Sequence, residues 1–318
     1  MKKSILAGLA LLALGTAQAQ ETPVVTQNFG DTLKVKKDTT YWQRSFSGGA
    51  NFNQASFSNW TGGGINSVAL GLVISTRALY EKGRTSWDNT GDFQLGYVNQ
   101  RGLSRKAADQ LFLNSVLGHK IAPKWDMFAS GTFNTFFAPG YQYDKLPANR
   151  TRQQISGFFA PAQLTFAWGV AYRPNDWFSL RLSPFAPRFT FVADDAVRVR
   201  AGADGIVRPD PTATAFGVEA GKSVRTEWLA LQLQAALNKN ITDNININAR
   251  YQTYANYQTL DAIDHRLDLT VAAKINKYLS TTLGVIALFD KDFSENWQLQ
   301  QTLAIGLSYN VTTFRKKK

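Results

Sequence analysis

The chain has 318 residues, a formal net charge of +12, no cysteine and two histidines. The absence of cysteine excludes disulfides, thiolate metal sites and cysteine nucleophiles. The mean hydropathy is -0.23, and no run of the roughly 18 apolar residues that a membrane-spanning helix needs occurs in the sequence, so transmembrane helices are excluded.

The start of the chain has the three parts of a secretory signal peptide: a basic pair, Lys2-Lys3, an apolar run over 5–14 and a small-residue cleavage site at 17–19. We therefore expect residues 1–19 to be removed, which lowers the net charge from +12 to +10 (12 − 2). Residues 20–40 are polar and lack a sustained period, so we expect a flexible periplasmic lead-in.

From Tyr41 onward the sequence alternates with period two, which is typical of strands with two different faces. Between Leu229 and Leu237, for example, leucine and alanine on one face alternate with mainly glutamine and alanine on the other. A soluble sandwich also shows one apolar face, so the signal peptide decides in favour of a membrane barrel. The predicted strands are 41–57, 65–81, 85–99, 110–121, 125–138, 157–172, 177–192, 225–239, 245–257, 264–276, 279–290 and 297–313.

Connections between these strands alternate in length. The short ones are predicted at 82–84, 122–124, 173–176, 240–244 and 276–278, and the longer ones at 58–64, 100–109, 139–156, 193–224, 258–263 and 291–296. Outer-membrane barrels have short periplasmic turns and long outer loops, so this alternation predicts that both termini are periplasmic. The eight tryptophans lie toward strand ends, as expected for interfacial aromatic belts.

The predicted lipid face is apolar, whereas the opposite face carries charges that lipid would not tolerate. The lipid face includes Leu70 and Leu72 in one strand and Leu267 and Leu269 in another. This face shows no polar stripe that would indicate a subunit contact. Oligomeric state stays open. The fold class is therefore all-β: a transmembrane antiparallel up-and-down β-barrel of about twelve strands over 41–314, followed by a basic tail at 315–318.

The first strand and first outer loop carry the most distinctive motif, an Asn-Phe-Asn-Gln segment at 51–54 followed by Asn59, Trp60, Thr61, Gly62, Gly63 and Gly64. This motif resembles the signature of a Bacteroidota outer-membrane β-barrel family catalogued as domain of unknown function 3078, and the resemblance extends over about 41–314. It implies a barrel in the outer membrane. Because that family has no assigned activity, the resemblance implies no functional residues.

Catalytic chemistry has little support in the sequence. His265, beside Asp264 and near Asp268, is the one candidate general base, but a strand-end histidine exposed to solvent is the favoured interpretation. No cluster has metal-ligand spacing, and we expect no cofactor. Basic residues in the two longest loops are expected to contact lipopolysaccharide phosphates, and no nucleic-acid motif is present.

The leading functional hypothesis is a narrow pore or binding barrel for a small polar solute, because twelve strands fall between filled barrels and open channels. The residues expected to line its lumen are Arg181, Arg250, Arg266, Asp268 and Lys274. A non-conducting structural or accessory barrel of an envelope complex is the alternative, and a lipid-modifying enzyme is less favoured. Expected partners are outer-membrane lipids, lipopolysaccharide and, during biogenesis, the barrel-assembly machinery.

Overall fold

The alternating sequence folds into antiparallel strands, with a single turn of 3-10 helix, η1 (Asp195–Val197). The structure, a computed structural model, describes residues 41–56, 66–260, 262–276, 279–292 and 294–312. Within these ranges no helix has the length and apolarity to cross a membrane. The twelve principal strands are β1 (Trp42–Ala55), β2 (Ser67–Lys82), β3 (Thr85–Gln100), β4 (Leu103–Ala122), β5 (Trp125–Thr135), β8 (Ala162–Asn175), β9 (Phe178–Phe185), β14 (Ala230–Asn240), β15 (Ile245–Asn256), β16 (Asp264–Lys274), β17 (Leu279–Asp290) and β18 (Ser294–Thr312).

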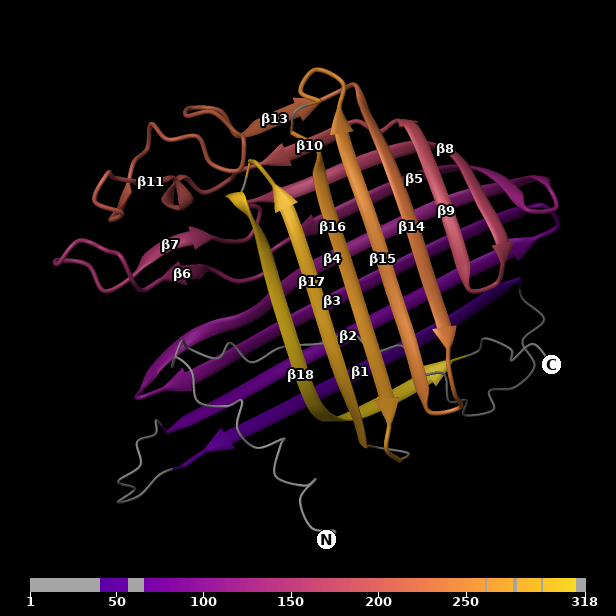
Figure 1. Cartoon of the computed structure of the whole chain (residues 1–318), viewed down its shortest axis with the longest axis horizontal. Helices are drawn as coiled ribbons and strands as arrows, with labels where there is room; N and C mark the ends of the chain where they lie inside the picture. The colour runs from indigo at the N-terminus through magenta and orange to yellow at the C-terminus, as the bar shows by residue number, and fades with distance from the viewer. Residues whose placement is uncertain (1–40, 57–65, 261, 277–278, 293, 313–318) are drawn as a thin grey trace, which may run out of the picture.

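Each of these twelve strands pairs with a neighbour on both sides. The ladder runs β8-β5-β4-β3-β2-β1-β18-β17-β16-β15-β14-β9, and β9 pairs again with β8. The β8–β9 ladder is irregular, and at its bulge a Cβ added to Gly169 would collide with the carbonyl of Leu182, so glycine permits the close approach. The pairings therefore return to their starting strand, and Figure 1 shows the two halves of the wall, β1 to β5 and β14 to β18, one behind the other.

Six short strands lie at the end of the barrel that carries the longest connections, called here the long-loop end. β10 (Arg188–Phe191) and β13 (Val224–Glu227) pair with each other, and β10 also pairs with β8. β6 (Gly140–Gln142) pairs with β7 (Gln153–Ser156), and β11 (Val199–Ala201) pairs with β12 (Val207–Pro209). Figure 1 shows β6, β7 and β11 together beyond the barrel wall.

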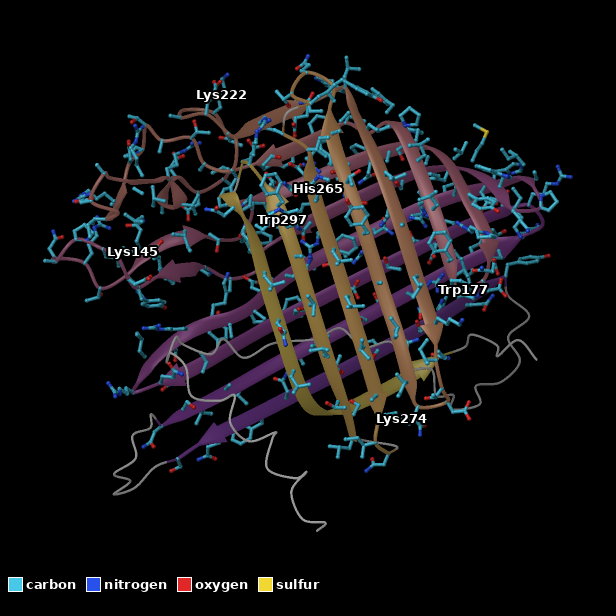
Figure 2. All side chains as sticks on the ribbon, in the orientation of Figure 1. Lys145, Trp177, Lys222, His265, Lys274 and Trp297 are labelled. Atoms are coloured by element: carbon cyan, nitrogen blue, oxygen red, sulfur yellow. The ribbon has the colours of Figure 1, made fainter. Side chains whose placement is uncertain are left out.

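The predicted lipid faces are confirmed by exposure. Leu70 is 60% exposed and Leu72 43%, whereas Ala69 and Val73 on the other face of β2 are buried. The register continues this pattern across strands, because Leu70 lies opposite Tyr97 and Leu72 opposite Leu95. A row of exposed apolar side chains on one face of each strand is what a lipid-facing wall requires. Figure 2 shows side chains standing off both faces of the wall.

One predicted long connection is wrong. β4 begins at Leu103 rather than at 110, so β3 and β4 are joined by the two-residue turn Arg101-Gly102. Both turn residues have positive φ, 52° and 79°, a conformation that glycine adopts readily and that matches the twist of a hairpin. The start of this strand was missed because the segment from Ser104 to Gln110 is mainly polar and does not show the alternation of apolar and polar residues that indicates a strand.

Two predicted strands are interrupted. The strand predicted over 177–192 divides into β9 and β10 at Ala186 and Pro187, and the strand predicted over 225–239 divides into β13 and β14 at Trp228 and Leu229. Proline has no N–H for the ladder, so an interruption at Pro187 is expected on physical grounds. Pairing continues across the break through a hydrogen bond of 2.8 Å from the Ala186 N–H to the Ala230 carbonyl.

Aromatic side chains gather at both ends of the wall. At the short-turn end, the rings of Trp42 and Trp87 lie 5.8 Å apart, and the ring of Trp125 lies 4.8 Å from that of Tyr172. The long-loop end has a second group, in which Trp297 lies 5.4 Å from the ring of Phe289. Two belts of this kind are typical of the two membrane interfaces. Of the seven tryptophans within the described residues, six lie near strand ends, as predicted; for Trp168 the prediction is wrong, because it lies in the middle of β8.

The expectation of an outer face without a polar stripe is wrong. A row of aligned outward positions crosses the wall from β1 to β5 and contains Arg44, Asn89 and Ser115. The Trp87 Nε1–H donates to Ser115 Oγ at 2.8 Å, and that hydroxyl donates to Asn89 Oδ1 at 2.7 Å. This bonding satisfies polar groups on a face that is otherwise apolar.

Several sequence predictions fall outside the described residues. These are the signal peptide, the lead-in at 20–40, the signature loop from Asn59 to Gly64 and the basic tail at 315–318.

Candidate functional site: the barrel interior and its loop cap

The five residues predicted to line the lumen all lie on the inward parity of their strands. Arg181 in β9 and Arg250 in β15 stand at the middle of the wall, and so do Arg266 and Asp268 in β16. Lys274 is the last residue of β16 and lies at the short-turn end (Figure 2). Sequence parity therefore assigned the inward face, whereas the height of each residue along the wall comes from the structure.

Arg266 and Asp268 form a fork-shaped ion pair on one strand. The Arg266 Nε and Nη2 groups donate to the carboxylate at 2.9 and 2.7 Å, and Arg250 Nε approaches the same carboxylate at 3.7 Å. Two-point bonding of this kind fixes the arginine in one orientation. Asp268 thus compensates two arginines, and the group carries a net positive charge.

Arg250 also reaches to the far side of the interior. Its guanidinium carbon lies 4.9 Å from the centre of the Phe112 ring in β4. Four strands separate β15 from β4 around one side of the ladder and six around the other, so the two residues stand on nearly opposite walls. This contact is a side-chain bridge across the barrel interior, stabilised by attraction between a cation and an aromatic face.

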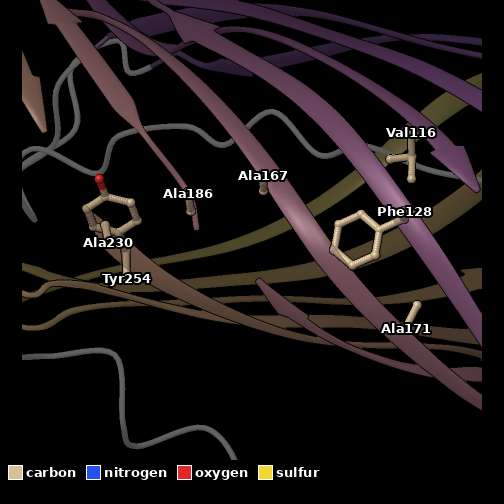
Figure 3. Close-up of a cluster of buried hydrophobic side chains, with 7 residues drawn as sticks. All are labelled: Val116, Phe128, Ala167, Ala171, Ala186, Ala230 and Tyr254. Carbon is tan, nitrogen blue, oxygen red and sulfur yellow. The ribbon is translucent and has the colours of Figure 1, made fainter. Parts of the chain in front are cut away.

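Arg181 forms a second contact at the same level. Its guanidinium carbon lies 5.6 Å from the centre of the Phe128 ring in β5, and it reaches that ring over β8, whose inward residues there are small. Ala167 and Ala171 of β8 are buried. Figure 3 shows Phe128 and Ala171 at one end of the buried cluster, with Ala167 between them and Tyr254. Small residues on one strand thus make room for large ones from its neighbours.

The space left beside Arg181 is small. The enclosed cavity beside Arg181 has a volume of about 10 Å³ and is lined mainly by amide and hydroxyl side chains, among them Gln232, Gln234 and Gln252. A cavity of that size holds roughly one water molecule. Beside Arg181 the interior is therefore packed.

A buried ion-pair network lies at the long-loop end of the interior. Arg188 donates to Asp264 at 2.6 Å, and its guanidinium carbon lies 3.3 Å from the centre of the Tyr254 ring. Arg225 pairs with Glu227 at 3.2 Å and also with Asp292 in the turn after β17. These pairs link β10 and β13 to strands further along the wall.

Two more ion pairs lie toward the short-turn end. Arg77 binds Asp88 through two hydrogen bonds of 2.8 and 2.7 Å, and Arg173 pairs with Asp126 at 3.2 Å. Period-two alternation in the sequence could have assigned all four residues to the interior, because each lies next to a residue predicted to face outward. What the sequence did not indicate was which carboxylate each arginine would bind.

The connections 136–161 and 192–223 pack together into one unit, called here the loop cap. Gln154 Nε2 donates to Asp194 Oδ2 at 2.7 Å, and the Val207 N–H donates to the Lys145 carbonyl at 2.7 Å. Buried apolar residues of both connections pack beside these bonds, namely Ala160, Val192, Val197, Ala215 and Val218.

Arg198 is the most extensively hydrogen-bonded side chain described in the longer connection, and only 1% of its surface is exposed. Its Nε donates to Asp195 at 2.7 Å, its Nη1 to the carbonyls of Ala213 and Val218, both at 2.9 Å, and its Nη2 to the carbonyl of Lys222 at 2.8 Å. A buried guanidinium with three carbonyl partners holds three separate parts of the loop in fixed positions.

The other basic residues of the longer connection are paired within it. Arg200 binds Asp210 at 2.6 Å, and Arg208 binds Asp204 at 2.6 Å. The hydrogen bond from Arg208 and that from the Ile206 N–H hold the pKa of Asp204 well below its ordinary value. Because of these pairs, much of the basic charge expected to meet lipopolysaccharide is compensated inside the loop cap.

His265 stands on the outer face, away from the two carboxylates that are its neighbours in sequence. Its Nδ1 lies 2.9 Å from the Tyr251 hydroxyl, and its ring stacks 6.0 Å from the ring of Trp297, beside which Figure 2 shows it. Asp264 and Asp268 occupy the inward parity of the same strand. His265 is therefore a half-buried part of the aromatic belt near the end of its strand, rather than a side chain exposed to solvent.

His119 lies at the short-turn end of β4, where its Nδ1 is 3.3 Å from Thr85 Oγ1. Among the residues that the structure describes, no group of three or more histidine or acidic side chains could hold a metal ion.

The continuous ladder, the apolar outer face and the charged interior define the class of protein: a transmembrane antiparallel up-and-down β-barrel. Residues 52–141 match the model of the family described as "Protein of unknown function (DUF3078)", in agreement with the resemblance of the first strand and loop. No curated protein matches the chain.

Among solved structures, the chain is similar to the translocator domain of autotransporter NalP from Neisseria meningitidis, with 10% sequence identity, a TM-score of 0.36, and coverage of 84% of this chain and 86% of that chain. It is similar to the CymD monoaromatic hydrocarbon channel at 12% identity and a TM-score of 0.33, with 87% and 89% covered. For the β domain of the Bordetella autotransporter BrkA the values are 11% identity, a TM-score of 0.31, and 85% and 97% coverage.

Proposed function

We propose that this protein is a non-conducting outer-membrane barrel that holds the loop cap at the cell surface, as a structural or accessory component of the envelope. The short turns, the start of β1 and the end of β18 share one end of the wall, since Ser45 lies opposite both Arg77 and Thr312. In outer-membrane barrels that end faces the periplasm, so both termini are periplasmic in this proposal. Lipopolysaccharide and outer-membrane lipids surround the wall, and the barrel-assembly machinery inserts it.

The observation that carries this proposal is the bridged interior. Arg250 reaches Phe112 from the opposite wall, and the cavity beside Arg181 has room for about one water molecule. An ion crossing the barrel would have to displace both contacts and the paired charges above and below them. Burial of paired arginines and carboxylates supports a sealed interior rather than a permanent channel.

A narrow pore or binding barrel for a small polar solute is the second candidate. It is favoured by the lining of the same level, where amide and hydroxyl groups from several strands converge around Arg181. A lipid-modifying enzyme has the least support, because His265 faces Tyr251 and Trp297 on the outer face, with Asp264 and Asp268 on the inner one.

Planar-bilayer recordings distinguish the two candidates. We expect the purified wild-type protein to give no conductance steps, because the bridge blocks the interior. The double variant Arg250→Ala with Phe112→Ala removes both ends of the bridge, and we expect it to give discrete steps of conductance.

The matched control is Arg84→Ala, which removes an exposed arginine from a short turn and leaves the interior unchanged; it should be as silent as wild type. Regular conductance steps from the wild-type protein would contradict the non-conducting barrel and favour the pore.

A further inference from the structure

Arg181 differs from the other inward arginines in having no carboxylate partner. Within the described part of the chain, Arg77, Arg173, Arg188 and Arg266 each form an ion pair, whereas Arg181 forms none. Its one hydrogen bond runs from Nη1 to Gln234 Oε1 at 3.4 Å, which is long for an N–H···O bond. Its Nε–H is buried and has no hydrogen-bond partner. A positive charge is thus enclosed with most of its donors unused.

The cavity against which Arg181 lies has a lining suited to an anion. None of its lining residues is acidic. Besides Arg181, seven of them have side-chain groups able to donate hydrogen bonds: Asn114, Ser130, Thr132, Ser183, Gln232, Gln234 and Gln252. Amide groups can turn their N–H toward an anion without moving the backbone. The nearby Phe112 and Phe128 rings exclude bulk water from two sides.

We propose that this cavity is a binding site for a single monatomic anion of the chloride class, held by the Arg181 Nε–H and by side-chain amides and hydroxyls. A buried unpaired charge is costly, and a bound counter-ion removes that cost without a protein carboxylate. The volume of about 10 Å³ accommodates one particle close to the size of water, which excludes carboxylates, phosphates and sulfates.

The site goes beyond the proposed function, since it requires only the enclosed cavity beside Arg181 and not a barrel that is closed to ions. A bound anion would complete the packing between β5, β8 and β9, where Arg181 is the register partner of Ala171 and its guanidinium faces the Phe128 ring. It would thereby stabilise the folded barrel.

Thermal unfolding of the purified protein in detergent tests the site. Chloride is compared with gluconate, an anion too large for the cavity, at equal ionic strength. We expect chloride to raise the wild-type Tm by about 2–4 °C, because a ligand that binds only the folded state stabilises it. Arg181→Gln should remove this chloride dependence, and the control Arg84→Gln should retain it.

Equal Tm values of the wild-type protein in both salts would overturn the proposal, and so would an Arg181→Gln variant that keeps the full chloride effect. If that variant does not fold, crystals of the wild-type protein in bromide decide the question: an anomalous peak beside Arg181 Nε is expected, and its absence means that water alone fills the cavity. Conductance of the wild type with an intact chloride effect would overturn the proposed function and leave the anion site standing.

Discussion

Replacing Arg198 by methionine is expected to unfold the longer connection of the loop cap while leaving the barrel wall intact. Three carbonyl oxygens, those of Ala213, Val218 and Lys222, lose their donor in a buried position. An unsatisfied buried acceptor costs about 1–3 kcal/mol, so the combined loss is larger than a loop of this size can tolerate. Hydrogen exchange over 192–223, measured against exchange in the wall strands, gives the result directly.

The control for this prediction is Arg200→Met, which removes an exposed arginine from the same connection. Arg200 is paired with Asp210, but its side chain is 64% exposed, and a surface pair contributes little. Protection of 192–223 should persist in this variant. Unchanged protection in Arg198→Met would show that the buried guanidinium does not hold the loop cap together.

Replacing Arg188 by methionine is expected to destabilise the barrel itself. Arg188 is 8% exposed, and its loss leaves the carboxylate of Asp264 without a partner in a mostly buried position near Glu227 and Asp290. Removing one partner of a buried pair costs about 3–5 kcal/mol, chiefly through the charge that stays behind. Urea unfolding of the barrel refolded into lipid vesicles measures the change in the free energy of unfolding.

The double variant Arg188→Met with Asp264→Asn separates the cost of the orphaned charge from the loss of packing. It should be more stable than Arg188→Met alone, because no unpaired carboxylate remains. The exposed pair Arg208 and Asp204 supplies the control, and Arg208→Met should leave the unfolding midpoint unchanged. A double variant less stable than Arg188→Met would refute the assignment of the cost to Asp264.

Most of the barrel wall was predictable from the sequence, because the pattern that assigns residues to its two faces lies within each strand. Period-two alternation assigns each residue to a face without knowledge of any other strand, and Leu70, Leu72 and Leu269 all lie on the predicted face. Short turns such as Gly83-Arg84 were predictable for the same reason, since a few residues determine them. The strand from Leu103 to Gln110 was missed because its polar residues do not alternate with apolar ones.

The interior was predictable only in part. Parity placed Arg181, Arg250, Arg266 and Asp268 inside, but their partners depend on strand register across the whole barrel. The contact of Arg250 with Phe112 joins residues 138 positions apart in the sequence (250 − 112), and no local pattern indicates it. Arg188 was also missed, because it follows Pro187 in a short interrupted strand. The same parity that gave the lumen residues would have placed His265 outside.

The central claim is that one face of each strand meets lipid and the other a closed interior, and spin labels along one strand pair test it most directly. The chain has no cysteine, so each single-cysteine variant carries one label. Leu269 and Val271 lie on the outer face of β16, whereas Thr270 and its partner Asn248 lie on the inner face.

We predict that labels at Leu269→Cys and Val271→Cys in lipid vesicles collide readily with oxygen, which is concentrated in the membrane, and rarely with a water-soluble nickel complex. Labels at Thr270→Cys and Asn248→Cys should be poorly accessible to both reagents. Free access of the nickel complex to the two inner positions would contradict the closed interior, and equal oxygen access at all four positions would contradict the two-faced membrane wall.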